Sequence, residues 1–371
     1  MKIAYFLGGL NRGGAESLVL DVCKKNSELP YEVCCIYRKE GDYSDAFHST
    51  NVRLLRLQRK RSLLGYISNF RKLVLSEHVD IVHAQTPSNA LVCIFALAFT
   101  RVKIVTTFHG FSFSDASRWQ RKLVYGKSSR IVCVSEFEKK HYVEKWELPI
   151  GNKIEVVYNG IDFSKFDSFD SVAKGVNNDG CDGGLLKMMM VGSFIGGRSQ
   201  LFVCKVMKAL RQRQIPFEFY FAGRRDAAES QRYDDCVSYC EQNGLDDCVH
   251  FLGERKDIPD LLKEMDLFVY ASEHDTFGIA VLEALAAGVP VIVNDWVVMK
   301  EITENGKYAE LYKTDDVNDC MEKIIRFIEN KNNKADELAE RKRTVAAEIR
   351  RKYSIENHIR KLNNVYQSCM K

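Results

Sequence analysis

Short runs of β-branched and aromatic residues alternate with amphipathic stretches along the first half of the chain. Apolar residues at helical spacing predict helices after Gly14, over residues 63–75 and near Leu91. Runs with the character of strands fall at residues 2–7, 31–37, 52–57, 80–84, 103–108, 130–135 and 153–158. Because strands and helices alternate, this pattern predicts a parallel sheet with helices on both faces.

The same alternation restarts in the second half, with predicted strands at residues 185–194, 217–223, 248–253, 266–272 and 290–295. Residues 174–184, between the halves, are rich in Gly, Asn and Asp, which is typical of a linker. A chain of 371 residues, 46% of them hydrophobic, can fill two cores. We therefore predict an α/β protein with an N-terminal domain over residues 1–170 and a C-terminal domain over residues 171–353.

The last segment, residues 354–371, carries apolar residues at Ile355, Ile359, Leu362 and Val365. This spacing predicts a helix with one apolar face, which must dock on another part of the protein. The longest apolar run, residues 90–99, has about half the length that a bilayer span needs. The apolar run at the start of the chain is shorter than the apolar core of a signal peptide. We therefore expect a chain that is either soluble or bound to a membrane surface.

The charge is unevenly distributed. The net charge is only +4, but residues 1–166 carry +9 and the remainder carries −5. Seven basic residues without an intervening acid lie in one stretch: Arg53, Arg56, Arg59, Lys60, Arg61, Arg71 and Lys72. This stretch suits contact with an anionic membrane or an anionic acceptor, but a solvated loop and helix explains it equally well. No nucleic-acid-binding motif accompanies it, so we expect no nucleic-acid partner.

Twelve cysteines are many, but none forms a C-x-x-C pair, and most sit in apolar runs. Buried thiols of this kind act as small hydrophobic groups, which favours a reducing cytosol and disfavours a zinc module. No D-x-D sequence occurs either, so the chain lacks that carboxylate pair for a nucleotide's metal ion. We expect no metal and no cofactor.

A glycine-rich turn follows the first predicted strand. Gly13 and Gly14 lie where the chain leaves the strand and starts a helix, so backbone N–H groups and a helix N-terminus are available to a phosphate. The turn is neither a G-x-G-x-x-G dinucleotide motif nor a P-loop. Glycines in such turns also serve only tight packing, and that alternative stays open.

The segment 271–293 is the most informative in the sequence. Asp275 and Thr276 are suited to capping a helix that runs from about Gly278 to Ala287 and ends at Gly288. Glu283 is the only polar residue within that helix. A carboxylate there needs hydrogen-bond donors, and sugar hydroxyls can supply them without a counter-charge. Contact of Glu283 with water or a backbone amide is the alternative.

A third group of residues lies at strand ends in the first half. His109 follows a predicted buried strand at its carboxyl end, where ligands bind in open α/β sheets. A histidine in this position is also often only structural. Asn159 and Gly160 predict a turn.

Taken together, these segments resemble retaining glycosyltransferases of family 4, which have the GT-B fold of two facing Rossmann-like domains with parallel sheets. The ordered set is NRGGAE, DIVHAQ, TTFHG, VSE, VYNGID, MMMVGSF, FAG, FLGERKDIPDLL, DLFVYAS and DTFGIAVLEALAAGVPVI. The resemblance implies that the final helix crosses back onto the N-terminal domain, which would bury its apolar face.

The resemblance also implies roles for individual residues. Asp275 would contact the hydroxyls of a donor sugar and Glu283 the ribose of its nucleotide. His109 would lie beside the reacting sugar. The remaining donor contacts would come from Gly13, Gly14, Arg198, Phe277, Gly278 and Ile279.

The chain departs from the family pattern at three positions. Ser193 stands where an arginine is common, Arg198 where a lysine is common, and Asp275 where a glutamate is usual. An arginine can still neutralise a diphosphate and bind it with two hydrogen bonds. Because Ser193 carries no positive charge, neutralisation of the diphosphate is weaker unless Arg224 or Arg225 supplies the missing cation.

The expected function is transfer of a hexosyl or N-acetylhexosaminyl group from a nucleotide diphosphate sugar, with UDP favoured over GDP. The acceptor would be a hydroxyl of a glycan or lipid-linked glycan, and the anomeric configuration would be retained. We expect this reaction in bacterial surface-polysaccharide synthesis, in the cytoplasm or at the inner face of the cell membrane. Two alternatives stay open: a nucleotide-sugar epimerase of the same architecture, and a catalytically weak subunit that binds sugar nucleotides.

Overall fold

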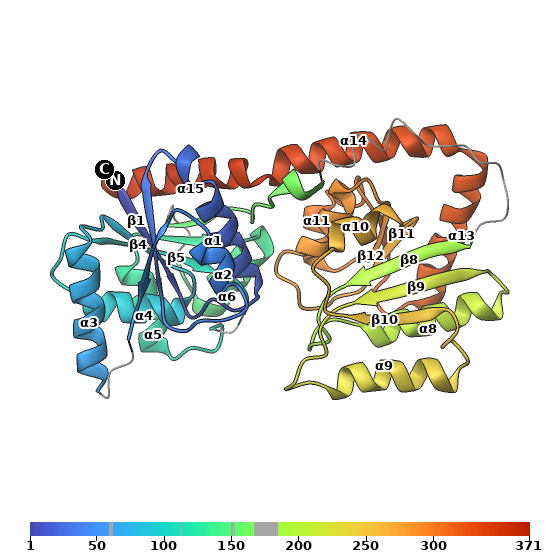
Figure 1. The fold of residues 1–371 in the computed structure, drawn as a ribbon, viewed down its shortest axis with the longest axis horizontal. Helices are drawn as coiled ribbons and strands as arrows, with labels where there is room; N and C mark the ends of the chain where they lie inside the picture. The colour runs from blue at the N-terminus through green and yellow to red at the C-terminus, as the bar shows by residue number, and fades with distance from the viewer. Residues whose placement is uncertain (59–61, 112, 150, 152, 167–184) are drawn as a thin grey trace. The chain divides into compact units, whose positions relative to one another are not determined.

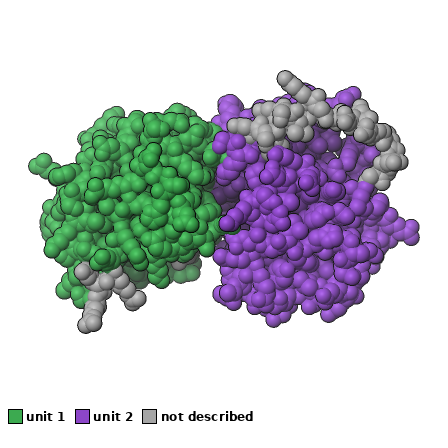
Figure 2. All heavy atoms as spheres, viewed as in Figure 1, with its two compact units in different colours: residues 1–162, 353–371 green, residues 163–352 purple. Residues whose placement is uncertain are grey.

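The computed structural model describes residues 1–371 except 59–61, 112, 150, 152 and 167–184. The chain divides into two compact units, coloured separately in Figure 2. Unit 1 comprises residues 1–162 and 353–371, and unit 2 comprises residues 163–352. The boundary that the sequence suggested, between residues 170 and 171, lies outside the described residues.

Unit 1 is built on a parallel sheet with helices on both faces, as predicted (Figure 1). Within the described ranges its strand order is β3-β2-β1-β4-β5-β6-β7. The strands are β1 (Lys2–Leu7), β2 (Glu32–Tyr37), β3 (Arg53–Arg56), β4 (Ile81–Ala84), β5 (Lys103–Phe108), β6 (Arg130–Cys133) and β7 (Ile154–Val156). The helices are α1 (Gly14–Lys24), α2 (Ser44–His48), α3 (Leu63–Ser76), α4 (Pro87–Ala96), α5 (Arg118–Lys127), α6 (Glu136–Trp146) and α15 (Ile355–Met370).

Alternate residues of the unit 1 strands serve two separate cores. In β1, Ile3, Tyr5 and Leu7 join a core formed with α1, α2 and α15, while Ala4 and Phe6 join a core formed with α3 to α6. This division follows from the two-residue period of a strand. Both faces are therefore covered, which explains why the strands are almost continuously apolar.

The final helix, α15, packs on unit 1, as the resemblance implied. Its residues Ile355, Leu362, Val365 and Tyr366 are fully buried in the core that contains β1 and α1. The backbone at Gly160 passes so close to α15 that an added Cβ atom would lie 2.6 Å from the Cβ atom of His358. The sequence predicted a turn at Asn159 and Gly160, but the structure has no turn there, and the contact with α15 explains the glycine.

Unit 2 repeats the architecture, with strand order β10-β9-β8-β11-β12-β13 within the described ranges. The strands are β8 (Leu186–Val191), β9 (Phe217–Ala222), β10 (Val249–Gly253), β11 (Leu267–Tyr270), β12 (Val291–Asn294) and β13 (Glu310–Tyr312). The helices are α8 (Gln200–Gln212), α9 (Gln231–Gln242), α10 (Ile258–Lys263), α11 (Ile279–Ala286), α12 (Val297–Ile302), α13 (Val317–Asn333) and α14 (Ala335–Tyr353). All of these strands except β13 were predicted. No helix of the described residues combines the length and apolar character that crossing a membrane requires.

Each sheet has one point where the direction of strand addition reverses. In unit 1 this point lies between β1 and β4, and in unit 2 it lies between β8 and β11. The loops that leave the carboxyl ends of the two central strands diverge there, and open α/β sheets bind their ligands at this position. In unit 2 these loops carry Arg198 and Asp275, and in unit 1 they carry Gly13 and Gln85.

Candidate donor-binding site

The two loops at the reversal point of unit 2 are interlocked by their backbones. The Ser199 N–H donates to the Ala271 carbonyl at 3.1 Å, and the Glu273 N–H donates to the Gly197 carbonyl at 2.8 Å. Gly197 has φ +82°, and an added Cβ atom would lie 2.0 Å from the Cβ atom of His274. A glycine is therefore required at position 197, both by its left-handed conformation and by the close approach of the two loops.

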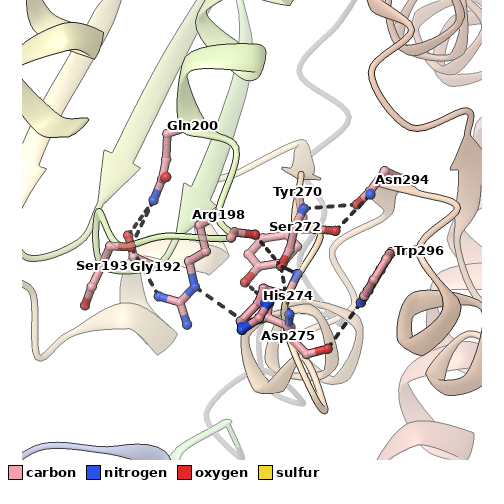
Figure 3. A network of polar contacts seen from close by, with 11 residues as sticks. Gly192, Ser193, Arg198, Gln200, Tyr270, Ser272, His274, Asp275, Asn294 and Trp296 are labelled. Atoms are coloured by element: carbon pink, nitrogen blue, oxygen red, sulfur yellow. Dashed lines mark hydrogen bonds and ion pairs between the residues drawn. The ribbon is translucent and has the colours of Figure 1, made fainter. Parts of the chain in front are cut away.

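The backbone around Asp275 is held by polar side chains (Figure 3). The Asp275 N–H donates to the Ser272 hydroxyl at 3.2 Å, and the Trp296 indole donates to the Asp275 carbonyl at 3.3 Å. Asn294 binds the backbone of Ser272 with both ends of its amide, at 3.1 and 2.9 Å. Because the backbone is fixed at several points, the fold defines where the Asp275 side chain leaves the main chain.

The Asp275 side chain does not cap the following helix, so that expectation was wrong. Its Oδ2 accepts the Tyr270 hydroxyl at 2.5 Å, and its Oδ1 lies 3.8 Å from Nε of Arg198. Helix α11 begins after Gly278, which is left-handed at φ +82° and makes no side-chain cap. The carboxylate is instead hydrogen-bonded to Tyr270, the last residue of β11, and the sequence pattern around Asp275 does not predict this contact.

Arg198 is placed to receive an anion. Its Nη1 donates to the Ser193 carbonyl at 3.4 Å, whereas its Nε is buried and has no hydrogen-bond partner within the described ranges. Gln200 holds the Gly192 and Ser193 carbonyls at 3.2 and 3.1 Å, which fixes the turn that carries the guanidinium. A buried donor of a cation without a partner is costly unless a ligand satisfies it.

Arg224 and Arg225 are both engaged elsewhere. Arg225 forms a two-pronged ion pair with Asp234 at 2.9 and 2.7 Å, and Arg224 binds Asp226 at 3.1 Å. The Arg225 pair holds the pKa of Asp234 below its usual range. In the structure, therefore, both arginines are paired with carboxylates, and their role as a replacement for the cation that is missing at Ser193 stays a prediction.

Helix α11 carries the remaining donor-site candidates of unit 2. Phe277 is buried, Gly278 caps the helix, and Ile279 is its first residue. Glu283 is half-buried on a helix whose other side chains are mostly buried. Gly288, at φ +76°, follows the helix as predicted. The N–H groups of the first turn of α11 follow the loop that holds Asp275, and the first N–H groups of a helix have no carbonyl of a preceding turn to bind.

In unit 1, the glycine-rich turn leads directly into α1. Gly13 is the N-cap residue, with extended backbone (φ −159°), and Gly14 is the first residue of the helix. A carboxylate oxygen of Glu16 would lie 2.5 Å from a Cβ atom added at Gly13. Burial raises the pKa of Glu16. An anionic group at Gly13 would therefore meet this carboxylate, which must move or be protonated to admit it.

His109 lies at the carboxyl end of β5, next to a buried glutamine. The Nε2 of His109 is 3.0 Å from Oε1 of Gln85, and Nε2 of Gln85 has no hydrogen-bond partner among the described residues. Loss of solvent and then the charge of His358 lower the pKa of His109 to about 3. Glu138 accepts the Gly110 N–H at 2.7 Å and so holds the turn after the histidine. The sequence analysis missed Gln85, although its place after β4 at the reversal point was a usable signal.

The basic stretch divides into engaged and unengaged residues. Arg53 binds Glu77 at 2.7 Å, and Arg71 donates to the Ala96 and Ala98 carbonyls at 2.8 Å. Arg56 is exposed on β3, whereas Arg59, Lys60 and Arg61 lie outside the described residues. Two large apolar side chains at the start of α3, Leu63 and Leu64, are exposed by 71% and 79%.

Among the residues that the structure describes, no group of three or more His, Cys, Asp or Glu side chains is arranged to hold a metal ion. The described cysteines are free, and all but Cys248 are buried. The structure brings Arg198 and Asp275 together, with α11 beginning shortly after Asp275. Gly13 and His109 lie in the other unit, at the carboxyl ends of β1 and β5.

Comparison with known proteins shows the family to which the chain is similar. Residues 12–165 match the profile of Glycosyltransferase Family 4, and residues 180–345 match that of Glycosyl transferases group 1. The capsular polysaccharide biosynthesis glycosyltransferase CapH of Staphylococcus aureus is 23% identical over 84% of this chain and 85% of its own length. An Escherichia coli UDP-Gal:alpha-D-GlcNAc-diphosphoundecaprenol alpha-1,3-galactosyltransferase is 26% identical over 70% of this chain and 69% of its length.

The fold is also that of solved glycosyltransferase structures. The crystal structure of Anabaena Alr3699/HepE in complex with UDP and glucose superposes with a TM-score of 0.81 at 18% identity, over 99% of this chain and all of that one. The two profiles together span most of the chain. The first covers most of unit 1, and the second covers most of unit 2. The chain therefore belongs to the glycosyltransferases with the GT-B fold, with a Glycosyltransferase Family 4 domain followed by a Glycosyl transferases group 1 domain.

Proposed function

We propose that this enzyme transfers a hexosyl or N-acetylhexosaminyl group from a UDP-sugar to a hydroxyl of a glycan or lipid-linked glycan, with retention of the anomeric configuration. The place of this reaction is bacterial surface-polysaccharide synthesis. Relatives named for capsule synthesis and for a UDP-Gal donor with a diphosphoundecaprenol acceptor support this choice, as does a structural neighbour in complex with UDP.

The observation that carries the proposal is the Nε of Arg198 at the reversal point of the second sheet, a buried donor with no hydrogen-bond partner in the part of the chain that the structure describes. Cleavage of the bond between the anomeric carbon and the diphosphate oxygen leaves negative charge on the diphosphate. Arg198 and the N–H groups at the start of α11 are fixed donors for that charge, and such preorganised donors stabilise a transition state strongly. Glu283 offers carboxylate oxygens to the hydroxyls of the nucleotide ribose.

Retention, in this proposal, follows from attack by the acceptor on the same face as the departing diphosphate, which takes the acceptor proton. The bond to the diphosphate oxygen breaks, and the bond to the acceptor oxygen forms at the anomeric carbon. His109 is neutral at working pH because its pKa lies near 3, so it serves the sugar as a hydrogen-bonding group and not as a cation. The reaction needs neither a metal ion nor a cofactor in this scheme.

The exposed Leu63 and Leu64, together with the basic stretch before them, support a peripheral contact with an anionic membrane. Such a contact would place unit 1 near a lipid-linked acceptor at the inner face of the cell membrane. The ion pair of Arg53 with Glu77 and the backbone contacts of Arg71 leave fewer basic residues for this role than the sequence count suggests.

A panel of UDP- and GDP-sugars, incubated with lipid-linked and simple sugar acceptors, tests the proposal. We expect acceptor-dependent release of UDP from one UDP-sugar and, by NMR, a product with the anomeric configuration of the donor. Inversion at the anomeric carbon would disprove the retaining mechanism. An epimerised sugar formed without acceptor would establish the epimerase, and thermal stabilisation by a UDP-sugar without turnover would establish a binding subunit.

A further inference from the structure

The Asp275 carboxylate has two polar neighbours, which lie at different distances from it. Its Oδ2 is 2.5 Å from the Tyr270 hydroxyl, whereas its Oδ1 is 3.8 Å from Nε of Arg198 (Figure 3). A hydrogen bond between a guanidinium and a carboxylate is normally about 2.7 to 2.9 Å long. The carboxylate is therefore hydrogen-bonded to the tyrosine and only near the arginine. Nε of Arg198 has no acceptor in hydrogen-bonding geometry among the described residues, while the guanidinium also interacts with the Tyr270 hydroxyl.

This arrangement is unusual for an arginine and an aspartate that lie side by side. Their side chains are only 25% and 18% exposed, so a direct ion pair would be little weakened by solvent. Only a short movement of the carboxylate separates the observed position from a direct pair. The fold must therefore hold the carboxylate back.

Tyr270 is the group that holds it. Tyr270 is the last residue of β11, fully buried, and its carbonyl accepts the Tyr312 hydroxyl at 3.0 Å. Burial, and then the charge of Asp275, raises the pKa of Tyr270, so the hydroxyl keeps its proton and remains a donor. The backbone contacts of Asp275 with Ser272 and Trp296 limit movement further, but they leave the side-chain rotation free.

We propose that Tyr270 is a positioning residue that keeps Asp275 off Arg198, so that the guanidinium stays available to an oxygen of the donor diphosphate. This inference rests on the proposed function, because it assumes that Arg198 binds the diphosphate. The negative charge of Asp275 beside Arg198 is compatible with diphosphate binding only because Tyr270 fixes the carboxylate at a distance from the guanidinium.

The inference predicts a loss that a second substitution repairs. In Tyr270→Phe the carboxylate is released and pairs with Arg198, so UDP binding measured by calorimetry should weaken about 10- to 100-fold, as expected for one charge-assisted hydrogen bond. In the double variant Tyr270→Phe/Asp275→Asn the competing charge is gone, and affinity should return to within about threefold of the parent, a residual difference under 1 kcal/mol. UDP is the probe because it lacks the sugar that Asp275 would contact.

Tyr366→Phe is the matched control. Tyr366 is as deeply buried as Tyr270, but it lies in unit 1, where its hydroxyl donates to the Tyr5 hydroxyl at 3.0 Å. The control variant should lose thermal stability, whereas its affinity for UDP should be unchanged. A merely structural role of Tyr270 predicts that Tyr270→Phe resembles this control, or that the double variant stays as weak as Tyr270→Phe, and either result would overturn the inference. If the parent protein binds neither UDP nor GDP, the proposed function itself fails, which is a distinct result.

Discussion

The Nε2 atom of His109 lies 3.0 Å from Oε1 of Gln85, and these two residues directly follow neighbouring strands of the unit 1 sheet. Since the amide oxygen can only accept, Nε2 of the histidine carries the proton and Nδ1 is the acceptor. The glutamine thus fixes both the tautomer and the ring orientation of the histidine. Its own amide nitrogen is buried and has no partner among the described residues, so it is a further donor at this strand end.

Replacing this glutamine should reduce turnover without unfolding the protein. In Gln85→Ala the imidazole loses its acceptor, and we expect kcat to fall about tenfold, the equivalent of one hydrogen bond. His109→Ala should lower kcat at least as far. Steady-state kinetics with the productive donor measures both, and turnover of Gln85→Ala at the parental rate would show that the contact does not orient a functional histidine.

Acid should destabilise the protein through its buried histidines. Burial lowers the pKa of His83, lowers that of His109 to about 3 and lowers that of His358 to about 4. Between pH 6.5 and 4 these histidines bind protons in the unfolded chain but remain neutral in the folded protein. The free energy of unfolding therefore decreases as the pH falls. His358 alone should account for about 2 kcal/mol between pH 7.5 and 5.0.

Urea unfolding of the parent and of His358→Gln at these two pH values measures the effect. The variant should lose less stability on acidification than the parent, by about that 2 kcal/mol, whatever its stability at pH 7.5. Equal pH dependence of the two proteins would mean that His358 takes up its proton in the folded state.

Gly197→Ala should damage unit 2. The new Cβ atom would lie 2.0 Å from the Cβ atom of His274, and the backbone at φ +82° adds strain. We expect a loss of about 2 kcal/mol or more in the free energy of unfolding, with weaker UDP binding because the Arg198 loop shifts. Gly126→Ala is the control, since no atom of the described residues lies within 4 Å of its added Cβ atom and the residue is helical. That variant should be neutral or slightly stabilised.

Serine at Leu63 and Leu64 should weaken binding to anionic vesicles. Both leucines are largely exposed and follow the basic stretch, so they are suited to insert among lipid chains. Co-sedimentation with vesicles containing phosphatidylglycerol should decrease several-fold for the double variant, while Val297→Ser, at an exposed apolar residue of unit 2, should bind like the parent. If the parent itself does not sediment with these vesicles, the membrane contact is refuted.

The sequence predicted the architecture well because its signals are local. The strands of two parallel sheets, the start of α1, the end of α11 before Gly288 and the apolar face of α15 all follow from periodicity and glycine placement. The strand β13 escaped prediction because it is only three residues long and its first two residues are only partly buried. Its pairing with β12 is a property of the folded sheet.

The contacts of the candidate site were less predictable because they depend on how strand ends and neighbouring loops meet in the folded chain. Asp275 looked like a helix cap, yet a tyrosine five residues earlier binds it and an arginine from the neighbouring loop lies beside it. Arg53 seemed to belong to a patch without acids, yet Glu77 reaches it from the end of α3. Local patterns identified the residues, and the order of the strands decided which of them meet.

Turnover and UDP binding of Glu283→Gln test the central claim, that the reversal point of unit 2 and helix α11 hold a nucleotide-sugar donor. The substitution keeps the shape of the side chain and removes the carboxylate charge. We predict that the parent releases UDP from one UDP-sugar in the presence of acceptor, and that the variant binds UDP at least tenfold more weakly, about 1.4 kcal/mol, with a matching loss of kcat/KM. A folded Glu283→Gln protein that binds UDP and turns over the productive donor like the parent would contradict this account.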